Sequence, residues 1–292
     1  MVDIIGVVFK RFASALHVSS DMKLSCESEC SALVVGDEKV TRSLLFLSAV
    51  TAASEMEMKV LFFTQTQIQS LPVILQTCPG SPPLKTESLK KIKFVYPRTL
   101  EELLEDVASL HELVNDPAPL PSLIIVDGLE KYVSVQDRLK QDARSMAAHT
   151  VALLHDTATF LTQNLNTRAE ENQLPCRIMV SYQPERKGQG ESDGLVPDPP
   201  LSVLERYLQV KCTFEKVTST VEQQNKWLLH LSGPRLQVNG VENVEKDLEL
   251  RWHMAQQPNG ALEFWPETAP KAETSQEQNT MEVKKKKRNH ID

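Results

Sequence analysis

Short apolar runs that alternate with helical segments are the feature that most constrains the fold of this chain. Each run is rich in Val, Ile, Leu or Phe and is short enough to form a single strand. The runs cover residues 31–36, 59–64, 91–96, 122–127 and 177–183. Because most of them are apolar on both faces, they are typical of parallel strands that are covered by helices. The sequence therefore predicts an α/β fold with a mostly parallel sheet.

Helical segments are expected between these runs. One is predicted at 41–55, directly after the first run. Thr99 and Glu102 have the spacing of a capping box, so a second helix should begin there and extend to about Val114. A longer helix is predicted around 147–165, where apolar residues recur at every third or fourth position.

The pattern changes after about residue 200, where short alternating strands replace the strand-and-helix order. The segment 258–260 reads Pro-Asn-Gly, which favours a tight turn between two strands. These later strands are expected near 209–217, 226–232, 247–254 and 261–265. We therefore expect antiparallel strands to extend one edge of the parallel sheet.

The chain of 292 residues is expected to form one domain with extensions. Residues 1–30 are predicted to be a mobile N-terminal extension, and residues 31–266 the α/β domain. Residues 267–292 are polar and are predicted to be a disordered tail. The tail contains a basic run, Lys284–Arg288, which favours nuclear import over a merely solvated end.

Charge and cysteine content limit the possible functions. The formal net charge is −7, so the chain as a whole is no basic nucleic-acid binder, and any DNA contact must come from a local patch. An odd count of five scattered cysteines predicts reduced thiols in an intracellular protein and no metal site. No apolar run reaches the length of a membrane-spanning helix, so no membrane contact is expected.

A degenerate phosphate-binding motif lies between the first run and the first helix. The pattern G-x-x-x-x-G-K-[ST] cradles phosphates with backbone N–H groups, while its lysine and hydroxyl contact phosphate and Mg²⁺. Gly36 and Ser43 match this pattern, but Thr41 and Arg42 replace the second glycine and the lysine. The position of the motif between a strand and a helix favours a phosphate loop, whereas the two replacements favour a chance match. If the motif binds ATP, the binding is expected to be weak.

The run 122–127 ends in Asp127, the place where such proteins hold Mg²⁺ through a carboxylate. Many α/β strands end in aspartate only to cap the following helix. Because Asp127 follows a degenerate phosphate loop in the expected order, both interpretations stay open.

Several segments resemble one protein family. The segments that carry the resemblance are Gln69–Pro72, Leu89–Pro97, Leu100–Val114, Pro121–Tyr132 and Leu153–Ala158. They are similar to the SWIM-domain-associated ATPases of the vertebrate Shu complex, which are divergent RecA-like recombinase paralogues. The resemblance covers roughly residues 31–215.

This resemblance implies a RecA-like P-loop core with ATP and Mg²⁺ as cofactors. It also implies a homologous-recombination accessory protein that binds single-stranded DNA and a SWIM-type zinc-finger partner. Such a protein would promote or stabilise recombinase filaments during double-strand break repair in the nucleus. Two alternatives remain: a working ATPase whose cycle drives filament remodelling, and a pseudo-ATPase scaffold that binds only proteins.

The resemblance also implies roles for individual residues. Phosphate and Mg²⁺ contacts fall on Gly36, Arg42 and Ser43, and catalytic roles on Asp127 and Gln183. DNA contacts fall on Arg186 and Lys187. The stretch Thr64–Gln67 contains no carboxylate where related enzymes place a catalytic glutamate, so ATP hydrolysis is expected to be weak or absent.

Phe12 and Ala15 fit a Phe-x-x-Ala pattern by which recombinases dock on a neighbouring subunit. The phenylalanine would fill an apolar pocket of the recombinase, and the alanine a shallower one. An ordinary amphipathic extension explains the same residues.

Overall fold

The computed structural model describes residues 2–12, 24–25, 31–68, 85–115, 118–133, 140–168, 175–184, 198–217, 225–233, 237–238, 250–257 and 262–267. Within these residues, nine strands form one sheet in the order β11-β10-β8-β7-β2-β6-β5-β3-β4. The strands are β2 (Ser31–Val35), β3 (Val60–Thr64), β4 (Ile92–Val95), β5 (Leu123–Asp127), β6 (Arg177–Tyr182), β7 (Val210–Val217), β8 (Asn225–Ser232), β10 (Leu250–Gln256) and β11 (Leu262–Pro266). A separate antiparallel pair joins β1 (Leu24–Ser25) to β9 (Gln237–Val238).

The sheet has a parallel part and an antiparallel part. The pairings among β2, β3, β4, β5, β6 and β7 are all parallel. Of these strands, β2, β3, β5 and β6 are buried along their whole length. From β7 outward through β8, β10 and β11, every pairing is antiparallel. This arrangement confirms the predicted α/β fold with a mostly parallel sheet and antiparallel strands at one edge.

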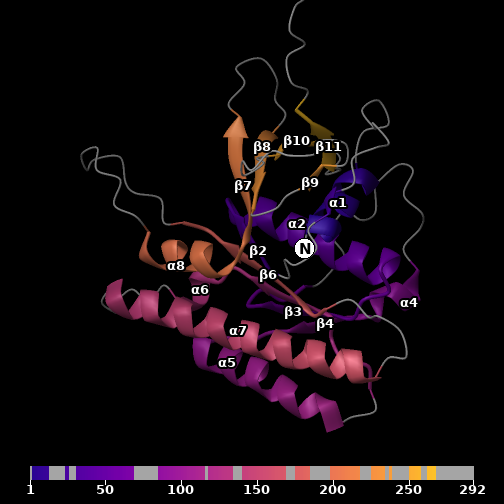
Figure 1. Cartoon of the computed structure of the whole chain (residues 1–292). Coiled ribbons are helices and arrows are strands. Elements are labelled where there is room, and N and C mark those ends of the chain that lie inside the picture. Colours follow the sequence, from indigo (N-terminus) through magenta and orange to yellow (C-terminus); the bar gives the residue numbers. More distant parts are fainter. Residues whose placement is uncertain are drawn as a thin grey trace, which may run out of the picture.

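Helices cover both faces of the sheet, so the chain forms three layers (Figure 1). One apolar core lies beneath α1 (Val2–Arg11) and α2 (Glu38–Glu55). The other lies beneath α5 (Leu100–Ser109), α7 (Lys140–Arg168) and α8 (Pro199–Tyr207). The remaining helical segments are short: α4 (Thr86–Leu89), the 3₁₀ turn Leu110–Asn115 and α6 (Glu130–Val133).

Local chemistry explains where helix boundaries differ from the prediction. Helix α2 begins three residues earlier than predicted, at Glu38, because the Asp37 carboxylate caps it by accepting from the Lys39 N–H. The helix predicted to reach Val114 ends as an α-helix at Ser109 and then tightens into the 3₁₀ turn. Helix α8 was not predicted from the sequence, although Asp198 and the two prolines after it form a typical helix start.

The first helix corrects one expectation. The N-terminus was expected to be mobile, which is wrong for residues 4–12, because the apolar stripe of α1 is buried against the antiparallel strands. The Phe9 ring lies 4.8 Å from Trp252 and 5.3 Å from Phe264 between ring centroids. Arg11 adds a salt bridge of 3.2 Å to Glu55 at the end of α2. The domain limits at residues 30 and 266 stay predictions.

The predicted helix start at Thr99 is confirmed, but the Glu102 side chain binds the residue before the cap and not Thr99 itself, so the capping box is only half formed. The Thr99 hydroxyl accepts from the Glu102 N–H at 3.2 Å, and the Glu102 carboxylate accepts from the Arg98 N–H at 2.7 Å.

We expect Thr99→Ala to lower the free energy of unfolding by about 1 kcal/mol, because one N–H of the first turn loses its acceptor. Chemical denaturation measures this change, and Thr99→Ser, which keeps the hydroxyl, should behave like the parent chain. Equal losses in both variants would show that the hydroxyl does not cap α5.

Candidate functional site

The carboxyl ends of the parallel strands β2, β3, β5 and β6 meet at one edge of the sheet. In open α/β sheets, ligands bind outside these strand ends. Here the edge gathers charged and polar side chains from the start of α2, from the ends of β3 and β5, and from the end of β6. The predicted residues Arg42, Asp127 and Gln183 all lie in this group.

The turn between β2 and α2 is too short to form a phosphate cradle. Strand β2 ends at Val35 and α2 begins at Glu38, so most of the residues predicted to curl around phosphates belong to a helix. A helix N-terminus binds phosphate through its free N–H groups. Here the first four are already bonded within the chain: Glu38 N–H to Gln183 Oε1, Lys39 N–H to Asp37 Oδ1, and Val40 and Thr41 N–H to the Asp37 carbonyl.

Arg42 binds Asp127 directly. The Arg42 Nε donates to Asp127 Oδ2 at 2.7 Å, and the Asp127 side chain is 1% exposed. The Thr64 hydroxyl donates to the same oxygen at 2.9 Å, and Ser181 donates to the other oxygen at 3.4 Å. The carboxylate that was predicted to hold Mg²⁺ is therefore neutralised by the residue that replaces the phosphate-loop lysine.

Glu38 extends this ion pair into a network. Its Oε1 lies 2.7 Å from an Arg42 terminal nitrogen and 2.7 Å from Lys131 Nζ. The hydrogen bond from Lys131 lowers the pKa of Glu38, and the charges of Lys131 and Arg42 add to the effect against a smaller opposing effect of burial. Glu38 therefore stays ionised near neutral pH, and the stabilisation from its lowered pKa is lost only as the pH falls through that value.

Gln183 joins α2 to α6. Its side-chain oxygen accepts from the Glu38 N–H at 3.2 Å, and its own N–H donates to Glu130 Oε2 at 2.9 Å. Burial raises the pKa of Glu130, against the hydrogen bond from Gln183, which lowers it. Gly128 makes this arrangement possible, because its φ of 72° turns the chain sharply from β5 into α6.

The other predicted residues lie apart from this network. Gly36 donates its N–H to the Tyr182 carbonyl at 3.3 Å, and the Ser43 hydroxyl donates to the Lys39 carbonyl at 2.7 Å. Ser43 lines a cavity between α2 and the antiparallel strands. Phe12 is 6% exposed and packs in the core beneath α1, so docking on a recombinase would require it to leave that core.

Three predicted residues, Ala15, Arg186 and Lys187, lie outside the described residues. Their predicted roles stay predictions. Sequence reasoning gave no role to Lys131 and Ser181, which both belong to the network. A lysine and a serine close to strand ends carry no pattern that distinguishes them from ordinary surface residues.

The described residues do not fit MgATP held by a phosphate loop. The first N–H groups of α2 are bonded, Asp127 is paired with Arg42, and the Ser43 hydroxyl is bonded to its own helix. Among the described residues, no group of three His, Cys, Asp or Glu side chains is arranged to hold a metal ion. Likewise, none of the helices in the described ranges is long and apolar enough to span a membrane.

Comparisons with known proteins place the chain beside one set of relatives. No family model matches the sequence. The chain is 36% identical over 172 residues to the mouse protein "ATPase SWSAP1" and 35% identical over 170 residues to the human protein of that name. Each match covers 58% of this chain, which spans 52% of the mouse protein and 64% of the human one.

Among solved structures, a KaiC-like protein of the archaeon Pyrococcus horikoshii aligns with a TM-score of 0.48 and 12% identity. The alignment covers 86% of this chain and 99% of the archaeal one. The resemblance inferred from the sequence is confirmed by the mammalian matches: over the matched residues, this chain is similar to the proteins named ATPase SWSAP1.

Proposed function

We propose that this protein is a homologous-recombination accessory protein that acts by binding rather than by turning over ATP. In this proposal it binds single-stranded DNA and a SWIM-type zinc-finger partner, and it promotes or stabilises recombinase filaments during double-strand break repair in the nucleus. The similarity to proteins named SWSAP1 and the RecA-like sheet support the recombination setting.

The ion pair between Arg42 and Asp127 carries the binding-based part of the proposal. In a working ATPase, the equivalent cation and carboxylate act on phosphate and Mg²⁺. Here they neutralise each other at 2.7 Å, and Glu38 binds both Arg42 and Lys131. The site therefore reaches an electrostatically satisfied state without a nucleotide.

The proposed DNA contacts, Arg186 and Lys187, follow Gln183 in the sequence after Pro184 and Glu185. Gln183 is hydrogen-bonded to both Glu38 and Glu130. The end of β6, which precedes this segment, is therefore held in place by the network. A pair of cations close to a fixed strand end is a suitable place for backbone phosphates of a single strand, because such contacts need charge and position more than base recognition.

A pseudo-ATPase scaffold that binds only proteins is the second candidate, and the same ion pair favours it. In that case recombinase and the SWIM-type partner would bind the chain, and DNA would not. The two candidates differ in one property, the affinity of the chain for single-stranded DNA.

Titration of single-stranded DNA over a range of salt concentrations tests the proposal. Neutralising both proposed contacts with Arg186→Gln and Lys187→Gln should weaken binding to all sequences alike. Each lost phosphate contact should reduce the slope of log affinity against log salt by roughly 0.7. In the same samples, DNA should not stimulate phosphate release from ATP.

The matched control is Lys10→Gln, which removes a positive charge from the exposed side of α1. An unchanged slope in the double variant would place the DNA site elsewhere. Absence of DNA binding by the parent chain, alone and with its partner, would favour the scaffold instead.

A further inference from the structure

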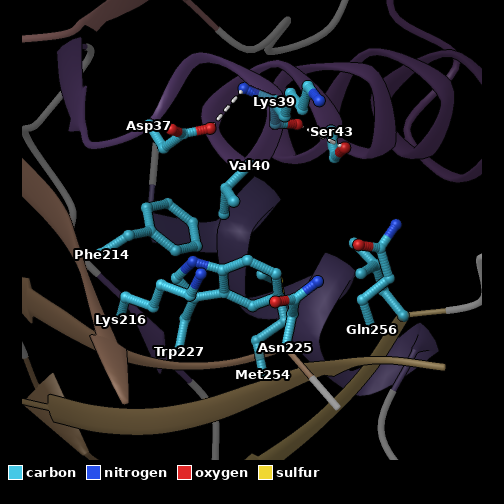
Figure 2. A pocket seen from close by; sticks show the side chains of 11 residues that line it. Asp37, Lys39, Val40, Ser43, Phe214, Lys216, Asn225, Trp227, Met254 and Gln256 are labelled. Carbon is cyan, nitrogen blue, oxygen red and sulfur yellow. Dashed lines mark hydrogen bonds between the residues drawn. The ribbon is translucent and has the colours of Figure 1, made fainter. Parts of the chain in front are cut away.

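A cavity of about 560 Å³ lies between α2 and the antiparallel strands (Figure 2). The first two turns of α2 form one wall, and the sheet face of β7, β8, β10 and β11 forms the other. Sites for small molecules are typically of this size, roughly 300–1,000 Å³. None of the residues of the ionic network described above lines it.

Strand register explains why the cavity has this lining. Trp227 is paired with Lys216 on β7 and with Met254 on β10, and Asn225 is paired with Gln256. Because directly paired residues share a face of the sheet, these side chains all lie on the face beneath α2. Farther along the strands α1 and α2 cover this face, and the cavity begins where that cover ends.

The inner part of the cavity is aromatic and apolar. Trp227 is 8% exposed and Met254 is 1% exposed, and Figure 2 shows Phe214 and Val40 beside the Trp227 ring. Aromatic side chains of this kind stack on nucleobases regardless of base identity. The amides of Asn225 and Gln256 lie on the same lining and can donate to and accept from the polar edge of a base.

The outer part of the cavity offers positive charge. Lys39 and Lys216 line it, and in the described part of the chain neither lysine forms an ion pair. Arg42 and Lys131, by contrast, are both bound to carboxylates. The cations available to an incoming anion near the start of α2 are therefore on the cavity side.

We propose that this cavity binds one free nucleotide, with its base on Trp227 and Phe214 and its phosphate at Lys39 and Lys216, without Mg²⁺. A single phosphate group can accept hydrogen bonds from both lysines. Further phosphates gain little, because Asp37 also lines the cavity and repels them. This mode does not use the bonded N–H groups at the start of α2, and it does not depend on the proposed DNA function.

Calorimetric titration of the purified full chain with AMP, and with ATP in the presence and absence of Mg²⁺, tests the proposal. We expect saturable AMP binding, ATP affinity within about tenfold of AMP affinity, and no effect of EDTA. Lys39→Gln and Lys216→Gln should each weaken AMP binding about tenfold, because each removes a charged hydrogen-bond donor. Both lysines are exposed, so both variants should fold.

Lys10→Gln serves as the control for loss of charge and should leave AMP affinity unchanged. No saturable binding up to about 1 mM AMP would overturn the proposal. Tight, Mg²⁺-dependent binding of ATP alone would also overturn it, in favour of the phosphate loop. An oligonucleotide that binds through Lys39 and Lys216 where AMP does not would place a DNA strand in the cavity and reject a free nucleotide. Any of these results leaves the salt dependence of DNA binding through Arg186 and Lys187 as a separate measurement.

Discussion

Phe9→Ala is expected to lower the free energy of unfolding by roughly 3–5 kcal/mol. The Phe9 side chain is fully buried, and its ring contacts Trp252 and Phe264 on two antiparallel strands. The substitution removes the apolar surface and leaves a cavity between α1 and the sheet, because the strands cannot move inward to fill it. A loss of this size is a large fraction of the stability of a typical domain.

Chemical denaturation, followed by circular dichroism, measures this loss. Lys10→Ala is the matched control, because Lys10 is the next residue of α1 and is exposed. It should change the free energy of unfolding by no more than about 0.5 kcal/mol. Equal stability of Phe9→Ala and the parent chain would mean that α1 does not belong to the core.

Arg42→Ala is expected to lower the free energy of unfolding by about 3 kcal/mol. The variant leaves the Asp127 carboxylate, which is 1% exposed, without its cation. An unpaired buried charge is far more costly than the pair was stabilising. The expected value lies at the lower end of the range for buried pairs, because the Arg42 side chain is 22% exposed and water can partly replace it.

A double-variant cycle distinguishes this effect from simple loss of packing. Asp127→Asn in the Arg42→Ala background should recover much of the lost stability. It removes the unpaired negative charge of residue 127 and keeps an acceptor for the Thr64 hydroxyl. If the two losses add instead, the residues do not form a coupled pair in solution. Nucleotide is left out of this measurement, so the result does not depend on whether the chain binds ATP.

The parallel sheet could be predicted from the sequence because its strands depend on local composition. The apolar runs at 31–36 and 122–127 can hardly form anything other than buried strands, and Thr99 with Glu102 marks a helix start within four residues. Each of these features is complete within a short window of sequence, so no knowledge of distant segments is needed.

The site could be predicted only in part. Arg42 and Asp127 were identified as candidates, but their ion pair joins residues that are 85 positions apart, and the bond from Lys131 to Glu38 joins residues 93 positions apart. Local pattern contains no information on such pairs. The early start of α2 has a different reason: the Asp37 carboxylate caps the helix inside the segment that the phosphate-binding motif covers.

The contact between α1 and the last strands has a consequence for synthesis of the chain on the ribosome. Phe9 leaves the ribosome early, but its neighbour Phe264 is made about 250 residues later. Until then the part of α1 that packs on β10 and β11 has no native surface to cover it, although α2 is already present. Exposed apolar surface of this kind favours aggregation and chaperone binding. A nascent or prematurely terminated chain that stops before β11 therefore exposes an apolar helix that the finished protein hides.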